Sequence, residues 1–179
     1  MIGAGFVFSA SAIFNHILEK DSDVLMERTA ARPLPSGRMT IFQAGIIMAV
    51  CLVIGIVLLA YKANSLVLVN SLAVFFLYGF VYTPLKRKTW LNTFVGGVPG
   101  AMPLLSGWFI DHSDVSLLIM ALFGMFFLWQ LPHFFSIAWI YRVAYEKAGL
   151  KMISVGDNTG RRTQWHMLVF SIMFVISTY

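Results

Sequence analysis

The sequence NHILEKDSD, from Asn15 to Asp23, is the most polar segment near the start of a 179-residue chain that is 59% hydrophobic and only 12% charged. Asn15, Glu19 and Asp23 are four residues apart, so a helix would place their side chains on one face, while Asp21 would point away from it. Carboxylates at the end of a membrane helix are costly near hydrocarbon and indicate a functional site. Mg²⁺ takes oxygen ligands, commonly one or two carboxylates plus substrate phosphates. The pattern makes Glu19 and Asp23 candidate metal ligands, and Asn15 completes a candidate catalytic set.

Two arginines follow this segment, again four residues apart, at Arg28 and Arg32. The planar guanidinium group matches the geometry of phosphate oxygens, so both side chains are candidates for binding a phosphorylated substrate. Judged alone, the stretch from Asn15 to Arg38 also fits a solvated helix end followed by a charged loop. The helix is expected to end by Arg32, because a residue that precedes proline disfavours helical geometry.

The composition excludes most soluble folds and predicts an all-α, polytopic membrane protein embedded in a lipid bilayer. A net charge of +5 could indicate a nucleic-acid partner. In so apolar a chain it is better explained by basic loops that face an anionic cytoplasmic leaflet, and we expect no nucleic-acid binding. The single cysteine, Cys51, permits no disulfide within the chain and lies in an apolar run.

Apolar runs predict about six membrane spans in one domain that covers residues 1–179. The expected spans are residues 2–20, 40–61, 64–82, 92–110, 115–140 and 164–179. Asn64 is a candidate N-cap, and Pro84 with Lys86-Arg87-Lys88 is expected to break the third span. The glycines and prolines of the fourth span predict a kinked, closely packed helix. Twelve of the thirteen basic residues fall in alternate connections, which the positive-inside rule places in the cytoplasm together with the acidic segment.

Three further polar motifs lie at or near the cytoplasmic ends of predicted spans. They begin at Tyr82 (YTPLKR), Trp129 (WQLPHF) and Arg142 (RVAYEKAG). The first is a candidate phosphate-facing cluster, although an ordinary basic loop would look the same. In the second, His133 lies beside Gln130 within an apolar span, where polar groups tend to be functional, although a lone histidine there can also be a packing residue.

The acidic segment, with Met26-Glu27-Arg28-Thr29 and Arg32-Pro33-Leu34 after it, resembles the first acidic motif of the UbiA-type intramembrane prenyltransferases. That motif usually reads Asn-Asp-x-x-Asp-x-x-x-Asp, whereas here His16 replaces the second residue and Glu19 the central Asp. The resemblance implies an all-helical bundle around a central cavity that opens to the cytoplasmic side. It also implies Mg²⁺ as the cofactor, held by Glu19 and Asp23.

Within this superfamily, the YTPLKR motif, Gly100-Ala101-Met102-Pro103 with Gly107-Trp108, and WQLPHF are similar to the haem O synthases, also called protohaem IX farnesyltransferases. This resemblance implies transfer of a farnesyl group from farnesyl diphosphate to a vinyl group of haem b, giving haem O. It implies a bacterial cytoplasmic (inner) membrane, and contact with haem A synthase or terminal oxidase assembly proteins. The implied substrate-binding residues are Arg28, Arg32, Lys86, Arg87, His133, Arg142 and Tyr145.

Aromatic side chains are candidates for stabilising the allylic cation that remains when the diphosphate leaves. Those in suitable spans are Phe75, Phe76, Tyr78, Phe126, Phe127, Phe134 and Phe135. Any of them could equally face lipid or the core.

The sequence departs from this family in two ways. The family has a span before the acidic segment and further spans after the sixth, so we expect a partial member. The family also usually has an Asp directly before the Tyr of its second acidic motif, where this chain has Ala144 before Tyr145. The nearest acids are Glu146 and Asp157, which puts a second metal position in doubt.

Three other functions remain open from the sequence. A prenyltransferase could act on a quinone ring or another aromatic acceptor instead of haem. A transporter or channel could use intramembrane polar groups and a broken fourth span for an ion path, but its polar residues should lie near the midplane and not at one face. An inactive fragment could retain the motifs without turnover.

Overall fold

The computed structural model describes the whole chain, Met1–Tyr179, and every regular element in it is a helix. The elements are α1 (Ile2–Val24), α2 (Glu27–Ala30), α3 (Ile41–Lys62), α4 (Ser65–Phe76), the π-helical segment η1 (Leu77–Tyr82), α5 (Thr83–Leu85), α6 (Asn92–Trp108), α7 (Leu117–Ile140), α8 (Arg142–Lys147) and α9 (Arg161–Ile176). Six long helical units therefore occupy the six predicted spans, and the predicted fold class is confirmed.

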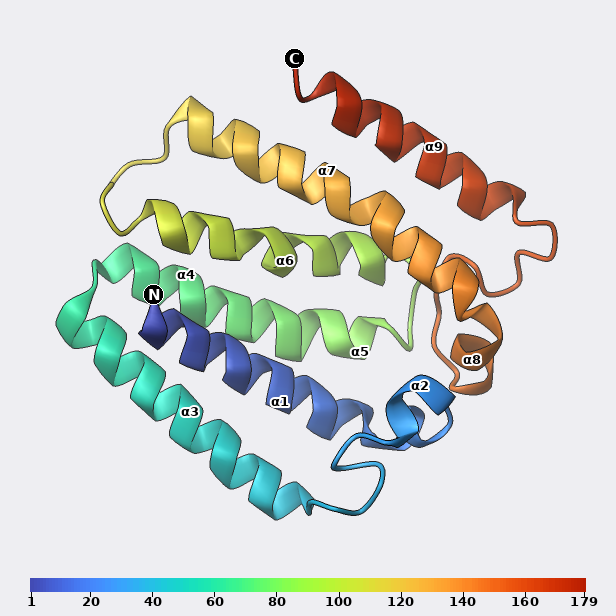
Figure 1. Ribbon diagram of the computed structural model, residues 1–179, viewed down its shortest axis with the longest axis horizontal. Coiled ribbons are helices and arrows are strands. Elements are labelled where there is room, and N and C mark those ends of the chain that lie inside the picture. The colour runs from blue at the N-terminus through green and yellow to red at the C-terminus, as the bar shows by residue number, and fades with distance from the viewer.

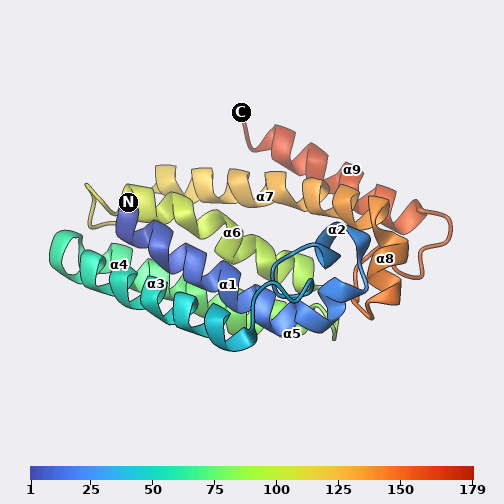
Figure 2. The ribbon, with the colours of Figure 1, turned by 60° about the horizontal axis from the view of Figure 1, so that its bottom comes forward.

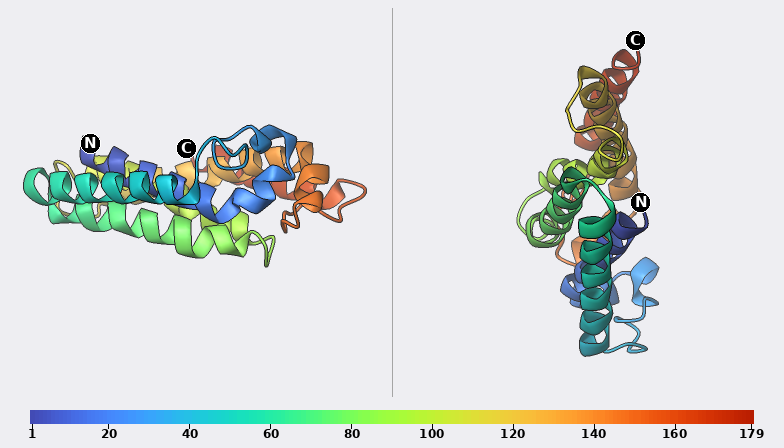
Figure 3. Two further views of the ribbon diagram at one scale, coloured as in Figure 1. Left: turned by 90° about the horizontal axis from the view of Figure 1, so that it is seen from below. Right: turned by 90° about the vertical axis from the view of Figure 1, so that its left-hand side faces the viewer.

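The long helices lie side by side in the order α3, α1, α4–α5, α6, α7 and α9, as Figure 1 shows. Seen end-on in Figure 3, the bundle has a long, narrow profile with α3 and α9 at opposite ends. Each helix in this row packs mainly on its immediate neighbours. The order along the chain is broken only at α1, which lies between α3 and α4 and has neighbours on both sides.

Four of these units are long and apolar enough to cross a membrane: α1, α3, the continuous helix Ser65–Leu85, and α7. The other two, α6 and α9, have 17 and 16 residues, slightly fewer than the about 20 that a straight span needs. Large apolar side chains are widely exposed on α3, α7 and α9, as expected for surfaces that contact lipid. The chain is an integral, multi-pass membrane protein.

Local sequence explains where these helices begin. Thr40 accepts a hydrogen bond from Gln43 N at 3.2 Å while Gln43 Oε1 accepts from Thr40 N at 2.9 Å, a capping box at the start of α3. Asn64 caps α4 as predicted, since its Oδ1 accepts from Leu66 N at 3.0 Å. These polar caps satisfy backbone groups at the helix ends, where apolar residues could not.

The third span breaks at the predicted basic residues but not at Pro84, which corrects the proline part of that prediction. The helix passes through η1 into α5 and ends at Leu85, just before the basic residues Lys86 to Lys88. A proline ring normally collides with the carbonyl one turn earlier in an α-helix. The preceding turns are π-helical, with Thr83 N bonded to the carbonyl of Tyr78, and this wider winding gives the ring room.

The fourth span continues through Pro99 and Pro103 as a single helix. Its glycines allow close approach to neighbours: a Cβ at Gly97 would meet the Phe127 ring, and one at Gly100 would meet the Gln130 amide. The predicted close packing of α6 is therefore confirmed, and α7 lies against this side of it.

The short helices α2 and α8 and the connection after α5 all lie at one end of the bundle, as Figures 1 and 2 show. This is the end at which the basic connections were predicted to meet. Asn92 Nδ2 donates to the Lys151 carbonyl at 2.8 Å, and Lys151 N donates to the Lys86 carbonyl at 2.6 Å. These bonds join the connection after α8 to the start of α6 and fix the backbone of Lys86.

Candidate active site

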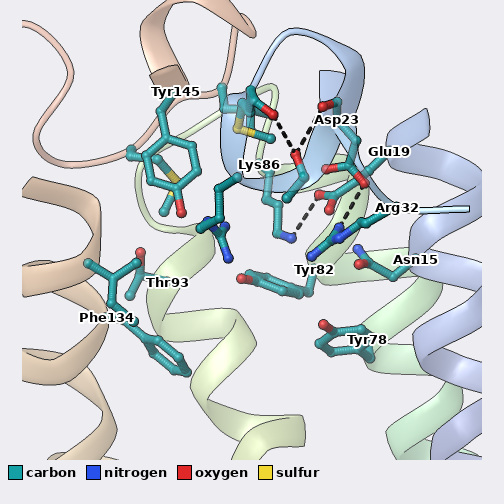
Figure 4. Close-up of a pocket in the computed structure, with 16 residues that line it drawn as sticks. Asn15, Glu19, Asp23, Arg32, Tyr78, Tyr82, Lys86, Thr93, Phe134 and Tyr145 are labelled. Atoms are coloured by element: carbon teal, nitrogen blue, oxygen red, sulfur yellow. Dashed lines mark hydrogen bonds and ion pairs between the residues drawn. The ribbon is translucent and has the colours of Figure 1, made fainter. Parts of the chain in front are cut away.

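A cavity of about 260 Å³ opens among α1, α2, η1, α6, α7 and α8 at the polar end of the bundle. We call it the polar cavity. Figure 4 shows Asn15, Glu19 and Asp23 on one side of it and Tyr145, Thr93 and Phe134 on the other. Its lining is Asn15, Glu19, Asp23, Met26, Arg28, Thr29, Arg32, Tyr78, Tyr82, Lys86, Thr93, Phe134, Ile137, Tyr145, Leu150 and Met152.

The α1 wall carries the three oxygen-bearing side chains predicted to share a helix face. Asn15, Glu19 and Asp23 are all in α1 and all buried, with exposed fractions of 5%, 7% and 1%. Asn15 Nδ2 donates to Thr83 Oγ1 at 3.0 Å, and Thr83 in turn donates to the Tyr78 carbonyl at 2.7 Å. This chain of bonds orients the amide and leaves its oxygen as a possible ligand.

Each buried carboxylate has one cationic partner. Arg32 Nη1 donates to Asp23 Oδ2 at 2.7 Å, and Lys86 Nζ lies 2.7 Å from Glu19 Oε1. Desolvation lowers the pKa of Lys86, but Tyr82, Glu19 and Tyr78 outweigh it and hold that pKa above its ordinary value. Lys86 therefore stays a cation at any physiological pH.

Arg28 makes no ion pair, unlike the other two cations that line the polar cavity. Its guanidinium carbon lies 5.0 Å from the centre of the Tyr141 ring, at the junction of α7 and α8. Thr29 Oγ1 donates to the Asp23 carbonyl at 3.0 Å, which holds α2 against the end of α1. The turn therefore presents Arg28 to the cavity with its hydrogen-bonding capacity unused by any carboxylate.

Aromatic side chains form much of the remaining wall. Tyr78 and Tyr82 lie with ring centroids 5.3 Å apart, and Lys86 Nζ lies 4.5 Å from the centre of the Tyr82 ring. Gly96 makes room for this arrangement, because a Cβ there would collide with the Tyr82 ring. Of the seven aromatic candidates for cation stabilisation, Tyr78 and Phe134 line the polar cavity, and the other five do not.

The donor set at the α1 wall fits Mg²⁺. Asp23 Oδ1 is buried and has no hydrogen-bond partner, while Glu19 contacts only Lys86 with its side chain. No cluster of three or more His, Cys, Asp or Glu side chains is present. Proteins nevertheless usually bind Mg²⁺ through one or two carboxylates, and the phosphate oxygens of the substrate supply further ligands.

Seven of the ten predicted site residues line the polar cavity: Asn15, Glu19, Asp23, Arg28, Arg32, Lys86 and Tyr145. The other three, Arg87, His133 and Arg142, are exposed and lie outside it. Arg142 donates to the Trp139 carbonyl and stacks on that indole at 4.3 Å, and His133 stacks on Trp129 at 5.6 Å. The roles predicted for these three remain predictions.

Two residues of the cavity lining, Thr93 and Tyr82, have polar groups suited to a ligand but were not predicted as site residues. Thr93 is 3% exposed, and its Oγ1 has no hydrogen-bond partner. Nothing in the sequence distinguishes it from other threonines. Tyr82 begins the YTPLKR motif, and its spacing of four from Lys86 at a predicted helix end is a sequence signal that the two side chains lie together.

Neither acid near the second motif reaches the polar cavity. Ala144 to Glu146 belong to the helix α8, so Glu146 points away from the direction of Ala144 and is exposed. Asp157 accepts hydrogen bonds from Thr163 N at 2.9 Å and from Thr163 Oγ1 at 2.8 Å, at the start of α9. Desolvation raises the pKa of the Asp157 carboxyl, but these bonds outweigh it and hold that pKa below its ordinary value. Asp157 therefore has a structural role.

Relatives of this chain are found among curated bacterial proteins. A protoheme IX farnesyltransferase of Cytophaga hutchinsonii is 40% identical over 94% of this chain and 59% of its own length. Those of Solibacter usitatus and Flavobacterium johnsoniae are 38% and 40% identical over 98% and 99% of this chain and 60% and 58% of their own lengths. The chain spans about 60% of the length of these curated relatives.

The fold is also that of a solved protein. The structure of a UbiA homolog from Archaeoglobus fulgidus bound to DMAPP and Mg²⁺ matches with a TM-score of 0.77 and 20% identity, over 96% of this chain and 61% of that one. The family model described as the UbiA prenyltransferase family matches residues 1–179. A match over the full chain, with relatives about 40% identical along nearly all of it, shows that the chain belongs to the UbiA prenyltransferase family.

Proposed function

We propose that this chain carries the diphosphate site of a farnesyltransferase that moves the farnesyl group of farnesyl diphosphate to a vinyl group of haem b, giving haem O and diphosphate. The observation that carries the proposal is the polar cavity, which gathers two carboxylates, three cations and aromatic walls at one end of an apolar bundle. The names of the curated relatives supply the farnesyl donor and the haem acceptor.

The cavity suits departure of an allylic diphosphate. Breaking the bond between the farnesyl C1 and the diphosphate oxygen leaves both electrons on the leaving group, so positive charge around the phosphates lowers the barrier. Arg28, Arg32 and Lys86 provide that charge. Glu19 and Asp23 would hold Mg²⁺, with Asn15 beside them, and the ion would neutralise further charge on the phosphates when bound. The homologue bound to DMAPP and Mg²⁺ supports this arrangement.

The allylic cation left behind needs electron-rich walls and little water. Tyr78, Tyr82 and Phe134 line the cavity next to the cationic residues, and aromatic faces attract cations. The farnesyl chain needs only an apolar surface, which the membrane-spanning helices supply. A vinyl carbon of the acceptor then bonds to farnesyl C1. Water adds to the cation left on the neighbouring vinyl carbon and releases a proton, which leaves a hydroxyl group there.

The position of the polar groups favours this reaction over ion transport. All five charged residues of the cavity lie at the same end of the bundle. Glu19 and Asp23 are in the last two turns of α1, Arg28 and Arg32 are in or just after α2, and Lys86 directly follows α5. A transport path would instead place polar groups near the bilayer midplane.

The direct test is an assay of the purified protein with Mg²⁺, farnesyl diphosphate and haem b, read by mass spectrometry. We expect a product with the mass of haem O, formed only when both substrates and Mg²⁺ are present. An isoprenoid-free quinone ring, offered in place of haem b, serves as the alternative acceptor. Farnesylation of that ring but not of haem b would replace the haem assignment by the aromatic-acceptor alternative.

The cytoplasmic position of the cavity predicts a labelling pattern in intact cells. Ser36, Lys88 and Ser113 are all exposed; the first two lie at the cavity end and Ser113 at the other end. After Cys51→Ala removes the native thiol, single cysteines at Ser36 and Lys88 should resist an impermeant maleimide, and one at Ser113 should react. All three should react after the membrane is permeabilised, and the reverse pattern in intact cells would overturn the cytoplasmic assignment.

A further inference from the structure

We propose that the polar cavity binds a prenyl diphosphate with a single divalent cation, and that the guanidinium of Arg28 occupies the place of a second metal on the wall opposite Glu19 and Asp23. The inference deepens the proposed function and rests on it. It follows from how charges are distributed among the residues that line the cavity.

Carboxylate ligands are confined to one wall of the cavity. Glu19 and Asp23 both project from α1, and they are the only acids among the lining residues. A hard divalent cation bound to protein needs at least one carboxylate as a rule. The wall made by α6, α7 and α8 offers Thr93, Phe134 and Tyr145 instead, so it has no anchor for a second ion.

Arg28 lies near Ala144, the position where the second acidic motif of the family usually has an Asp. A second hollow adjoins the polar cavity and is lined by Met26, Glu27, Arg28, Tyr141 and Ala144. Arg28 lines both spaces, whereas Ala144 lines only the hollow. Glu27 is exposed at the hollow and does not line the cavity. Arg28 is therefore the one charged residue that lines both the hollow beside Ala144 and the polar cavity.

The charge balance agrees with one ion. Three cations and two carboxylates give the cavity lining a formal charge of +1. A prenyl diphosphate carries about −3 near neutral pH, so its complex with one Mg²⁺ carries about −1 and neutralises the lining. A second Mg²⁺ would leave about +2 beside the buried side chains of Glu19 and Asp23, where uncompensated charge is expensive.

One polar atom on each wall is already free for this ligand. Asp23 Oδ1 on α1 and Thr93 Oγ1 on α6 are buried without hydrogen-bond partners. A buried acceptor or hydroxyl of this kind is costly unless a ligand or water satisfies it. Asp23 would bind the ion, while Thr93 and Arg28 would donate to the phosphate oxygens on the other side.

The number of bound ions tests the proposal without turnover. The purified full chain is titrated with Mn²⁺ in the presence of the unreactive analogue farnesyl S-thiolodiphosphate, and free Mn²⁺ is counted by electron paramagnetic resonance. We expect a single Mn²⁺ for each analogue bound. Two ions per analogue would overturn the inference and leave the proposed function standing, whereas no Mn²⁺-dependent analogue binding would overturn both.

A charge swap tests the place of Arg28. Arg28→Gln should weaken analogue binding about tenfold to a hundredfold, while Arg38→Gln, in the exposed loop before α3, should not. Arg28→Gln/Ala144→Asp replaces the guanidinium by a carboxylate and should bind a second Mn²⁺ and recover the affinity. Arg28→Gln/Ala144→Asn is the matched neutral control and should do neither. Unchanged affinity in Arg28→Gln, or no second ion in the Asp double variant, would refute the assignment.

Discussion

Replacing Asp23 with Asn should lower farnesyl transfer by about 10²–10³-fold, the usual effect of removing one group that stabilises charge in a transition state. Asp23 is 1% exposed at the end of α1, with Oδ2 bonded to Arg32 and Oδ1 without a partner. The neutral amide would bind Mg²⁺ poorly and would leave Arg32 without its counter-charge. Both changes weaken the hold on the diphosphate.

The matched control is two residues earlier on the same helix. Asp21→Asn removes the same charge from the same helix end, but Asp21 is exposed and does not line the cavity. Its effect on turnover should stay within about twofold, as for most surface substitutions. Transfer of radiolabelled farnesyl at saturating Mg²⁺ gives both rates. If the two variants lost activity equally, general charge at the membrane surface would explain the effect and not a metal ligand.

The α1 part of this site could be predicted from the sequence because helical spacing fixes it. Residues four apart on one helix share a face whatever surrounds them, so Asn15, Glu19 and Asp23 had to lie together once α1 formed. The positive-inside pattern likewise predicted that the basic residues of alternate connections lie at one end of the bundle. The polar cavity lies where the acidic face of α1 meets the end of the bundle that carries the basic connections.

The pairing of charges could not be predicted in the same way. Lys86 meets Glu19 and Arg32 meets Asp23 because α5 and the turn after α2 approach α1 at particular angles, which only the packed structure sets. Thr93 became visible only through its unpartnered hydroxyl in the cavity wall.

Residues transferred from a family motif gave a mixed result. Tyr145 lines the cavity, but Arg87, His133 and Arg142 do not. His133 and Arg142 each lie on an adjacent indole, at Trp129 and Trp139, so stacking defines their present positions. A motif identifies which residue types recur together, whereas the cavity identifies which of them reach one ligand.

Lys86→Met should lower the free energy of unfolding by about 3–5 kcal/mol, the typical effect of removing one partner of a buried ion pair. Lys86 and Glu19 side chains are only 13% and 9% exposed, so the remaining carboxylate would be buried without a counter-charge. Because the folded-state pKa of Lys86 is raised, this stabilisation is fully present below the ordinary lysine pKa and is lost only as the pH rises through the higher, folded-state value. Lys88→Met, which removes an exposed neighbour, should change stability little.

A double variant separates this structural role from the catalytic one. Lys86→Met/Glu19→Gln removes both charges of the pair, and replacing a buried ion pair by neutral side chains is often close to neutral for stability. The free energy of unfolding of this double variant in detergent should therefore be close to that of the unmodified protein. Its farnesyl transfer should not return, because one metal ligand and one phosphate-binding cation are gone. Recovery of activity together with stability would mean that Lys86 and Glu19 serve only to hold α5 against α1, and the diphosphate would then have to be bound by Asp23, Arg28 and Arg32 alone.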